Sequence, residues 1–173
     1  MAKRPAAAPE EDIEQAVQLI RTAWRQLLRG IESSTYLHVS ESDLRCLLFH
    51  ECLKLCEQRG IVPFLFTEYK INDKRVDLAL HLMAEKELII AIEIKHDPKP
   101  AKIEEDLKRL RELIEGGAVV RGVFLTLASS EYRLKERLEE QGIFQRFKVR
   151  NVEWHSFKRR IDGKNIDALF VVL

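Results

Sequence analysis

Three strand-like segments follow one another between residues 62 and 96, and the turns that join them constrain the fold more than any other feature. The segments run from Val62 to Ile71, from Arg75 to Met83 and from Leu88 to His96. Aliphatic and aromatic residues dominate all three, as is typical of strands. Turns of three and four residues are too short for a crossover. We therefore expect an antiparallel three-stranded meander.

The segments on either side of the meander have helical periodicity. Residues 10–29 carry one apolar stripe at three- and four-residue steps, and we expect Gly30 to end this helix. A second helix is expected from an N-cap at Ser40 to about Gln58. A third follows Pro98 and Pro100 and covers about Ala101 to Glu115.

The rest of the chain extends this unit. Residues 119–127 read as a buried strand, which a helical crossover allows to run parallel to the third strand of the meander. Another helix is expected over about Ser130 to Gln141, followed by a hairpin that turns near Asp162 and Gly163. The order predicts an α/β fold with a mixed sheet flanked by helices. We expect a disordered tail (1–9) and a single domain (10–173), divided into an N-terminal helix (10–30), a core (40–127) and a C-terminal helix and hairpin (128–173).

Ionisable residues interrupt the aliphatic runs at one edge of the meander. Glu93 and Lys95 share one face of the third strand, and Asp77 on the second strand falls opposite Glu93. Glu68 comes close to Asp77 across the first turn. Charges within a central strand are costly unless they are paired or bind a metal. Two carboxylates and a backbone carbonyl make part of an octahedron for a divalent cation, so the pattern indicates a metal site.

This pattern resembles the PD-(D/E)XK nuclease superfamily, whose members carry an Asp on one strand and (Asp/Glu)-X-Lys on the next. The matching segments are Val76-Asp77, within RVDLAL, and Glu93-Ile94-Lys95, within IIAIEIKHD. Val76 stands where the family has Pro, a position that varies and does not bind metal. The resemblance implies a restriction-endonuclease-like fold with an αβββαβ core over residues 40–127, plus an N-terminal helix and a C-terminal β-hairpin.

The resemblance also implies roles for these residues. Mg²⁺ or Mn²⁺ would be held by Asp77, Glu93 and the Ile94 carbonyl. Lys95 would position the attacking water and stabilise charge on the phosphate. Glu68 would be an accessory acid.

Members of the family often add a Glu in the helix before the sheet. Glu41, at the start of the second helix, is our choice as a catalytic residue and further metal ligand, because that helix start should come back near the end of the first strand. Glu51 is the competitor, since it lies on the apolar stripe of the same helix.

Any surface that binds nucleic acid must be local, because the net charge is only +1. Lys99 and Lys102 lie just past the catalytic strand and are expected to meet substrate phosphate. Lys148 and Arg150 belong to a segment from Arg146 in which basic and apolar residues alternate, as on a half-exposed strand. They are the second candidate contact with nucleic acid.

These interpretations predict a metal-dependent nuclease that hydrolyses DNA phosphodiester bonds, as an endonuclease. RNA stays open as a substrate, as does the pathway. The alternative is a catalytically inactive nuclease-like module that binds nucleic acid or a partner protein. The apolar stripe of the first helix is expected to pack on the domain, and a homodimer through that stripe stays open.

We expect a cytoplasmic protein with no membrane partner. No apolar run approaches the roughly 20 residues that span a bilayer. The segment Met1–Pro9 lacks the apolar core of a signal peptide. The cysteines, Cys46, Cys52 and Cys56, are expected to be buried and reduced, because they form no disulfide framework or zinc motif.

Overall fold

The computed structural model describes residues 10–36, 39–83 and 87–173, and its centre is a six-stranded mixed sheet. The expected tail of residues 1–9 and most of the second turn of the meander lie outside the described residues. In chain order the elements are α1 (Glu10–Glu32), α2 (Glu41–Gln58), β1 (Pro63–Ile71), β2 (Lys74–Met83), β3 (Glu87–His96), α3 (Pro100–Glu115), β4 (Arg121–Ser129), a 3₁₀ turn (Ser130–Tyr132), α4 (Leu134–Glu140), α5 (Ile143–Arg146), β5 (Asn151–Lys158) and β6 (Asn165–Val172).

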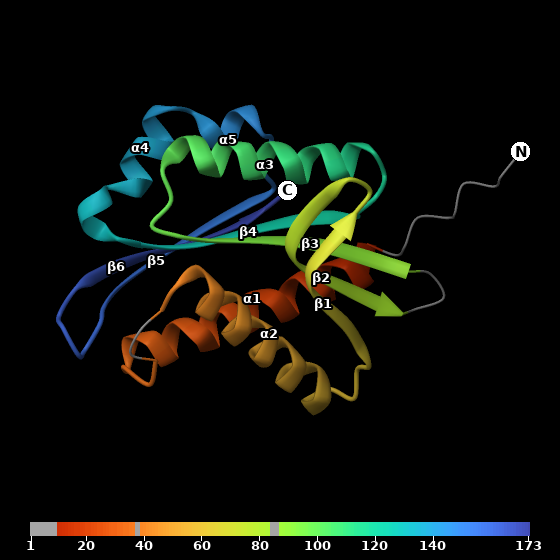
Figure 1. The fold of residues 1–173 in the computed structure, drawn as a ribbon, viewed down its shortest axis with the longest axis horizontal. Coiled ribbons are helices and arrows are strands. Elements are labelled where there is room, and N and C mark those ends of the chain that lie inside the picture. Colours follow the sequence, from red (N-terminus) through yellow and green to blue (C-terminus); the bar gives the residue numbers. More distant parts are fainter. Residues whose placement is uncertain (1–9, 37–38, 84–86) are drawn as a thin grey trace, which may run out of the picture.

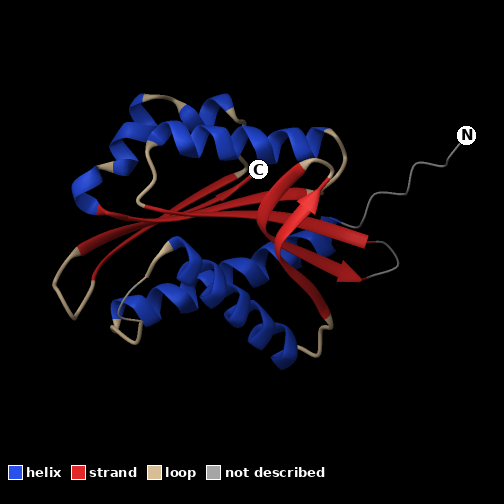
Figure 2. Ribbon diagram, viewed as in Figure 1, coloured by secondary structure: helices blue, strands red, loops and turns tan. Residues whose placement is uncertain are grey.

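Helices cover both faces of this sheet (Figures 1 and 2). The helices α1 and α2 lie on one face, while α3, α4 and α5 lie on the other. The strand order is β1-β2-β3-β4-β6-β5. β4 runs parallel to β3, and every other neighbouring pair is antiparallel. The expected meander and the parallel crossover through α3 are therefore confirmed.

The two faces of β2 and β3 have the different characters that side-chain alternation predicts. One face is aliphatic and packs in a buried cluster with α1 and α2; it carries Leu78, Leu80, Ile90, Ile92 and Ile94. The other face has the small residues Ala79 and Ala91, which pack beneath the apolar residues of α3. Small side chains bring α3 close to the sheet, so α3 also approaches the charged residues on that face.

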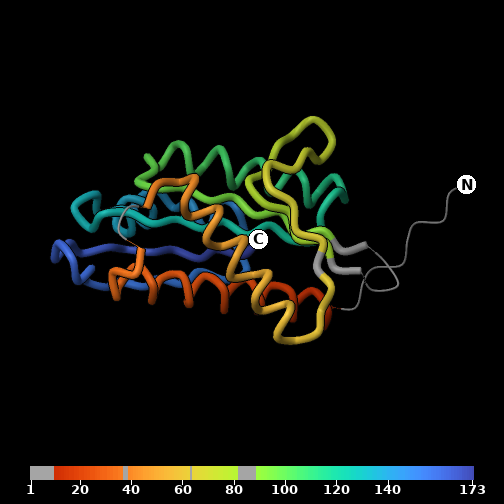
Figure 3. The backbone as a smooth tube through the Cα atoms, turned by 60° about the horizontal axis from the view of Figure 1, so that its bottom comes forward, coloured from red at the N-terminus to blue at the C-terminus, as the bar shows by residue number. Residues whose placement is uncertain are grey.

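The first helix differs from the prediction at Gly30. The helix continues through this residue to Glu32, because Gly30 provides close packing and does not act as a terminator. A Cβ at this position would overlap the ring of Tyr36. Ile20, Trp24 and Leu27 on the apolar stripe are fully buried within this chain. The stripe is therefore not available as a dimer seam. Figure 3 shows α2 crossing α1 obliquely on this side of the sheet.

The C-terminal third differs more. The helix expected over residues 130–141 is broken at Arg133, whose left-handed backbone (φ 49°) separates the 3₁₀ turn from α4. The segment from Arg146 to Arg150, which was expected to be a half-exposed basic strand, is not a strand. Arg146 ends the short helix α5, Lys148 has a left-handed backbone (φ 48°), and β5 begins only at Asn151. Its apolar residues pack against the cluster beneath α3, so the alternation reflects a capped helix end.

The cysteines follow the prediction in part. Cys52 and Cys56 are buried and free, but Cys46 is exposed, because it lies on the outer side of α2. No helix of the described residues is long and apolar enough to cross a membrane.

Candidate active site

Asp77 lies at the point where β2 and β3 separate. The ladder between these strands pairs Leu78 with Ile92. Beyond this pair the Ile94 N–H donates to Asp77 Oδ2 at 2.8 Å. A side-chain carboxylate thus takes the place of a main-chain acceptor, and the strands diverge at the residues that carry the charges. Glu93, opposite Asp77, is only 1% exposed.

The ammonium group of Lys95 fills the opening between the strands. Its Nζ donates to the Ile94 carbonyl at 2.8 Å, to Glu41 Oε1 at 3.2 Å and to Asp77 Oδ2 at 3.3 Å. These three oxygen groups are among those expected to hold a metal ion. In this state the lysine is the cation that neutralises them.

The N-terminus of α2 delivers Glu41 to this position. Ser40 caps the helix: its hydroxyl accepts from the Asp43 N–H at 3.2 Å, and the Asp43 carboxylate accepts from the Ser40 N–H at 2.8 Å. Glu51 lies elsewhere, buried next to Tyr36. Burial, and then the Glu51 carboxylate, raise the pKa of Tyr36. Of the two candidates, the structure therefore brings Glu41 to Lys95.

Two residues of α3, Asp106 and Arg109, also belong to the site, although neither was among the residues expected there from the sequence. Arg109 donates to Glu93 Oε1 at 2.7 Å and forms a short ion pair with Asp106. Asp106 is fully buried, and its Oδ2 has no hydrogen-bond partner among the described residues. This oxygen lies 3.9 Å from Lys95 Nζ. The signal in the sequence was a carboxylate on the buried stripe of α3, between Ile103 and Leu107.

Burial and crowding of carboxylates dominate the electrostatics. Burial, and then the neighbouring Asp77 carboxylate, raise the pKa of Glu93 to about 9, and Arg109 offsets only part of this rise. Burial also raises the pKa of Asp106. For Lys95, burial alone would lower the pKa, but the surrounding carboxylates raise it above its ordinary value. The lysine is therefore cationic at neutral pH.

The metal-free protein is expected to lose stability as the pH rises from about 4.5 to about 9. Glu93 in the unfolded chain loses its proton near its ordinary pKa of 4.5, whereas the folded protein keeps it to about pH 9. The unfolded state therefore binds fewer protons in this window. The free energy of unfolding falls by at most about 1.4 kcal/mol per pH unit. Urea unfolding in EDTA measures this slope, which Glu93→Gln should reduce. Equal slopes for both proteins would contradict the assignment.

The donor set suits a hard divalent cation. Carboxylate and carbonyl oxygens are the ligands that Mg²⁺ and Mn²⁺ prefer. Within the described ranges, however, no three His, Cys, Asp or Glu side chains lie close enough together to hold a metal ion as they stand. The contacts give the reason: Lys95 lies among the oxygens of Asp77, Glu41 and Ile94, and Arg109 binds Glu93. The chemistry of these oxygens suits such an ion, and the Lys95 ammonium lies among them.

Glu68 lies at the rim of this site. Its backbone is left-handed (φ 49°) within β1. Arg45 of α2 bridges the two carboxylates, at 3.1 Å from Glu68 and 3.6 Å from Asp77. Glu68 is therefore linked to Asp77 through Arg45, whereas the ion pairs of Lys95 among the described residues are with Glu41, Asp77 and Asp106.

The four residues expected to contact nucleic acid are divided between two places. Lys99 and Lys102 lie at the start of α3, just after the strand of Glu93, and Lys102 is bound to Glu105 at 2.8 Å. Lys148 and Arg150 precede β5, which is three strands from β3, roughly 14 Å across the sheet. Arg150 also pairs with Glu10. The structure brings the first pair near the site but not the second.

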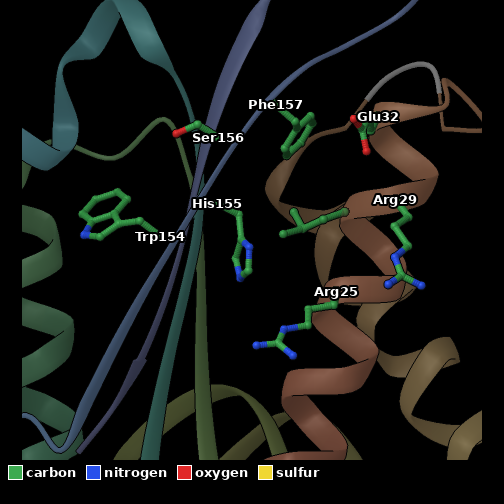
Figure 4. Close-up of a pocket in the computed structure, with 8 residues that line it drawn as sticks. Arg25, Arg29, Glu32, Trp154, His155, Ser156 and Phe157 are labelled. Carbon is green, nitrogen blue, oxygen red and sulfur yellow. The ribbon is translucent and has the colours of Figure 1, made fainter.

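Among the described residues, the hollows lined by basic side chains include two of more than 500 Å³. One, of about 520 Å³, adjoins the site and is lined by Asp73, Lys74, Arg75, Glu105, Lys108, Arg109 and Glu112. The other, of about 560 Å³, lies between α1 and β5 (Figure 4). There His155 points toward Arg25 and Phe157 lies beside Glu32, while Trp154 points to the other side of the sheet. Arg25, which lines this second hollow, is paired with Glu153 at 3.0 Å.

No family model matches this chain, and no match is found among curated proteins or solved structures.

Proposed function

We propose that this chain is a Mg²⁺- or Mn²⁺-dependent nuclease with a restriction-endonuclease-like core, which hydrolyses DNA phosphodiester bonds as an endonuclease. The proposal is carried by the convergence of Asp77, Glu41 and the Ile94 carbonyl on one cation, the Lys95 ammonium. The element order from α2 to β4 is the αβββαβ order of the PD-(D/E)XK nucleases. Asp77 and Glu93-Ile94-Lys95 occupy the matching positions on β2 and β3.

Asp77, Glu93 and the Ile94 carbonyl would hold the metal, with Glu41 as a further ligand. A bound divalent cation lowers the pKa of water and neutralises charge on phosphate. Lys95, released from its present contacts, would hold the attacking water at Nζ and stabilise the developing negative charge. In Glu93 and Asp77, the positive charge of the metal would replace the proton that the proximity of the two carboxylates favours.

A polyanionic substrate is supported by the basic side chains around the site. Arg75, whose side chain is 71% exposed, and Lys108 line the hollow beside Arg109. Lys99 is exposed at the start of α3. Phosphate contacts from such side chains position a nucleic acid without reading its sequence. The family resemblance favours DNA over RNA.

Incubation of the purified protein with supercoiled plasmid tests the proposal. Nicking is expected with Mn²⁺ or Mg²⁺ and none with EDTA. The control is an Asp77→Asn preparation purified identically, in which any contaminating nuclease would remain. Equal nicking by both preparations would reveal contamination. Absence of nicking on plasmid, single-stranded DNA and RNA alike would leave the nuclease proposal without support.

A further inference from the structure

The buried Asp106 carboxylate is only partly satisfied by the contacts that the structure shows. It is fully buried on α3, at a position where an apolar residue would pack. Arg109 binds its Oδ1, but its Oδ2 has no hydrogen-bond partner among the described residues. A buried acceptor without a partner destabilises the folded state, because it has given up its hydrogen bonds to water. Such an oxygen calls for a donor that the present state does not place on it.

Lys95 is the donor within reach. Its Nζ lies 3.9 Å from Asp106 Oδ2, so a movement of about 1 Å brings it within hydrogen-bond distance. At present Nζ is held by Glu41, Asp77 and the Ile94 carbonyl. These are the oxygens that a metal would need. Two cations cannot share them at hydrogen-bond distance, because their mutual repulsion is strong in a buried site.

We propose that Asp106 is a positioning residue that receives the Lys95 ammonium when a divalent cation takes the place of that ammonium on Asp77 and the Ile94 carbonyl. The inference rests on the proposed function in that it assumes a metal site at these oxygens. The lysine then has two positions, one for each state of the site. Arg109 holds Asp106 in place through the other carboxylate oxygen. Metal entry and lysine movement are one coupled event.

A double-mutant cycle on Mn²⁺ binding tests this coupling. Calorimetric titration with Mn²⁺ alone, without nucleic acid, would be made on the wild type, Lys95→Met, Asp106→Asn and the double variant. Lys95→Met removes the competing cation, so Mn²⁺ should bind at least about ten-fold more tightly. Asp106→Asn removes the second position of the lysine, so Mn²⁺ should bind at least about ten-fold more weakly. In the Lys95→Met background, Asp106→Asn should change the Mn²⁺ affinity by no more than about three-fold, because the lysine that Asp106 would receive is absent.

The outcomes separate the inference from the proposed function. An equal effect of Asp106→Asn in both backgrounds, or unchanged affinity in Lys95→Met, overturns the inference even if the plasmid is cleaved. If Mn²⁺ binding shows the expected coupling between Lys95 and Asp106 but no nucleic acid is cleaved, the inference is supported and the nuclease proposal is overturned. No Mn²⁺ binding by any of the four proteins overturns both. Asp106→Ser, which also removes the carboxylate, replaces Asp106→Asn if circular dichroism shows that the latter is unfolded.

Discussion

The Asp77→Asn variant is expected to cleave plasmid at least about 10³-fold more slowly than the wild type in Mn²⁺. Asp77 is the residue on which the site converges, since one carboxylate accepts the Ile94 N–H at 2.8 Å and the Lys95 ammonium at 3.3 Å. An amide keeps the shape of the side chain but supplies only one oxygen and no charge. The metal loses a ligand, and the lysine loses the partner that orients it. Single-turnover nicking of supercoiled plasmid measures the effect.

The matched control is Asp12→Asn. Asp12 lies in the first turn of α1, which covers the face of the sheet opposite α3 (Figure 1). The same chemical change there should leave the cleavage rate within about two-fold of the wild type, because Asp12 is not among the residues proposed to bind metal or substrate. A rate for Asp77→Asn within about three-fold of the wild type, in a folded protein, would sink the assignment of Asp77.

The Arg109→Met variant is expected to lower the free energy of unfolding by about 3 kcal/mol. Arg109 binds two buried carboxylates, Glu93 at 1% exposure and Asp106 at 0%. Removing one partner of a buried ion pair leaves the other without compensation. The expected loss lies at the lower end of the usual range, because a proton on Glu93 reduces the charge to be compensated. Urea unfolding at neutral pH in EDTA gives the value.

The neighbouring substitution Lys108→Met provides the comparison. Lys108 is exposed on the same helix, and its replacement by Met keeps helix propensity nearly constant. We expect a change within about 0.5 kcal/mol there. Should Arg109→Met prove as stable as Lys108→Met, the Arg109 contacts with Glu93 and Asp106 would have no energetic weight.

Local patterns were enough to predict the meander and the proximity of its charged residues. Two short turns fix antiparallel neighbours, and side-chain alternation then fixes which residues share a face. The observed pairing of Leu78 with Ile92 places Asp77 opposite Glu93, as the turn length predicted. The capping box at Ser40 was equally readable, because it depends on residues three apart.

Features that depend on how distant segments pack could not be predicted in this way. The role of Gly30 depends on Tyr36, which packs against it only in the folded chain. The spacing of Asp106 places it on the apolar stripe of α3, but only the docking of that helix over Ala79 and Ala91 shows that its carboxylate is fully buried. The alternation before β5 fits either a strand or a helix end. The choice is made by packing of its apolar residues beneath α3.

Anomalous scattering from a crystal of the full chain grown with Mn²⁺ tests most directly whether the oxygens around Lys95 hold a divalent cation. We expect a peak at bonding distance from the Asp77 and Glu93 carboxylates and the Ile94 carbonyl, with the Lys95 ammonium displaced toward Asp106. A map without a peak there, in which Lys95 still contacts Asp77, Glu41 and Ile94 at saturating Mn²⁺, would contradict the account.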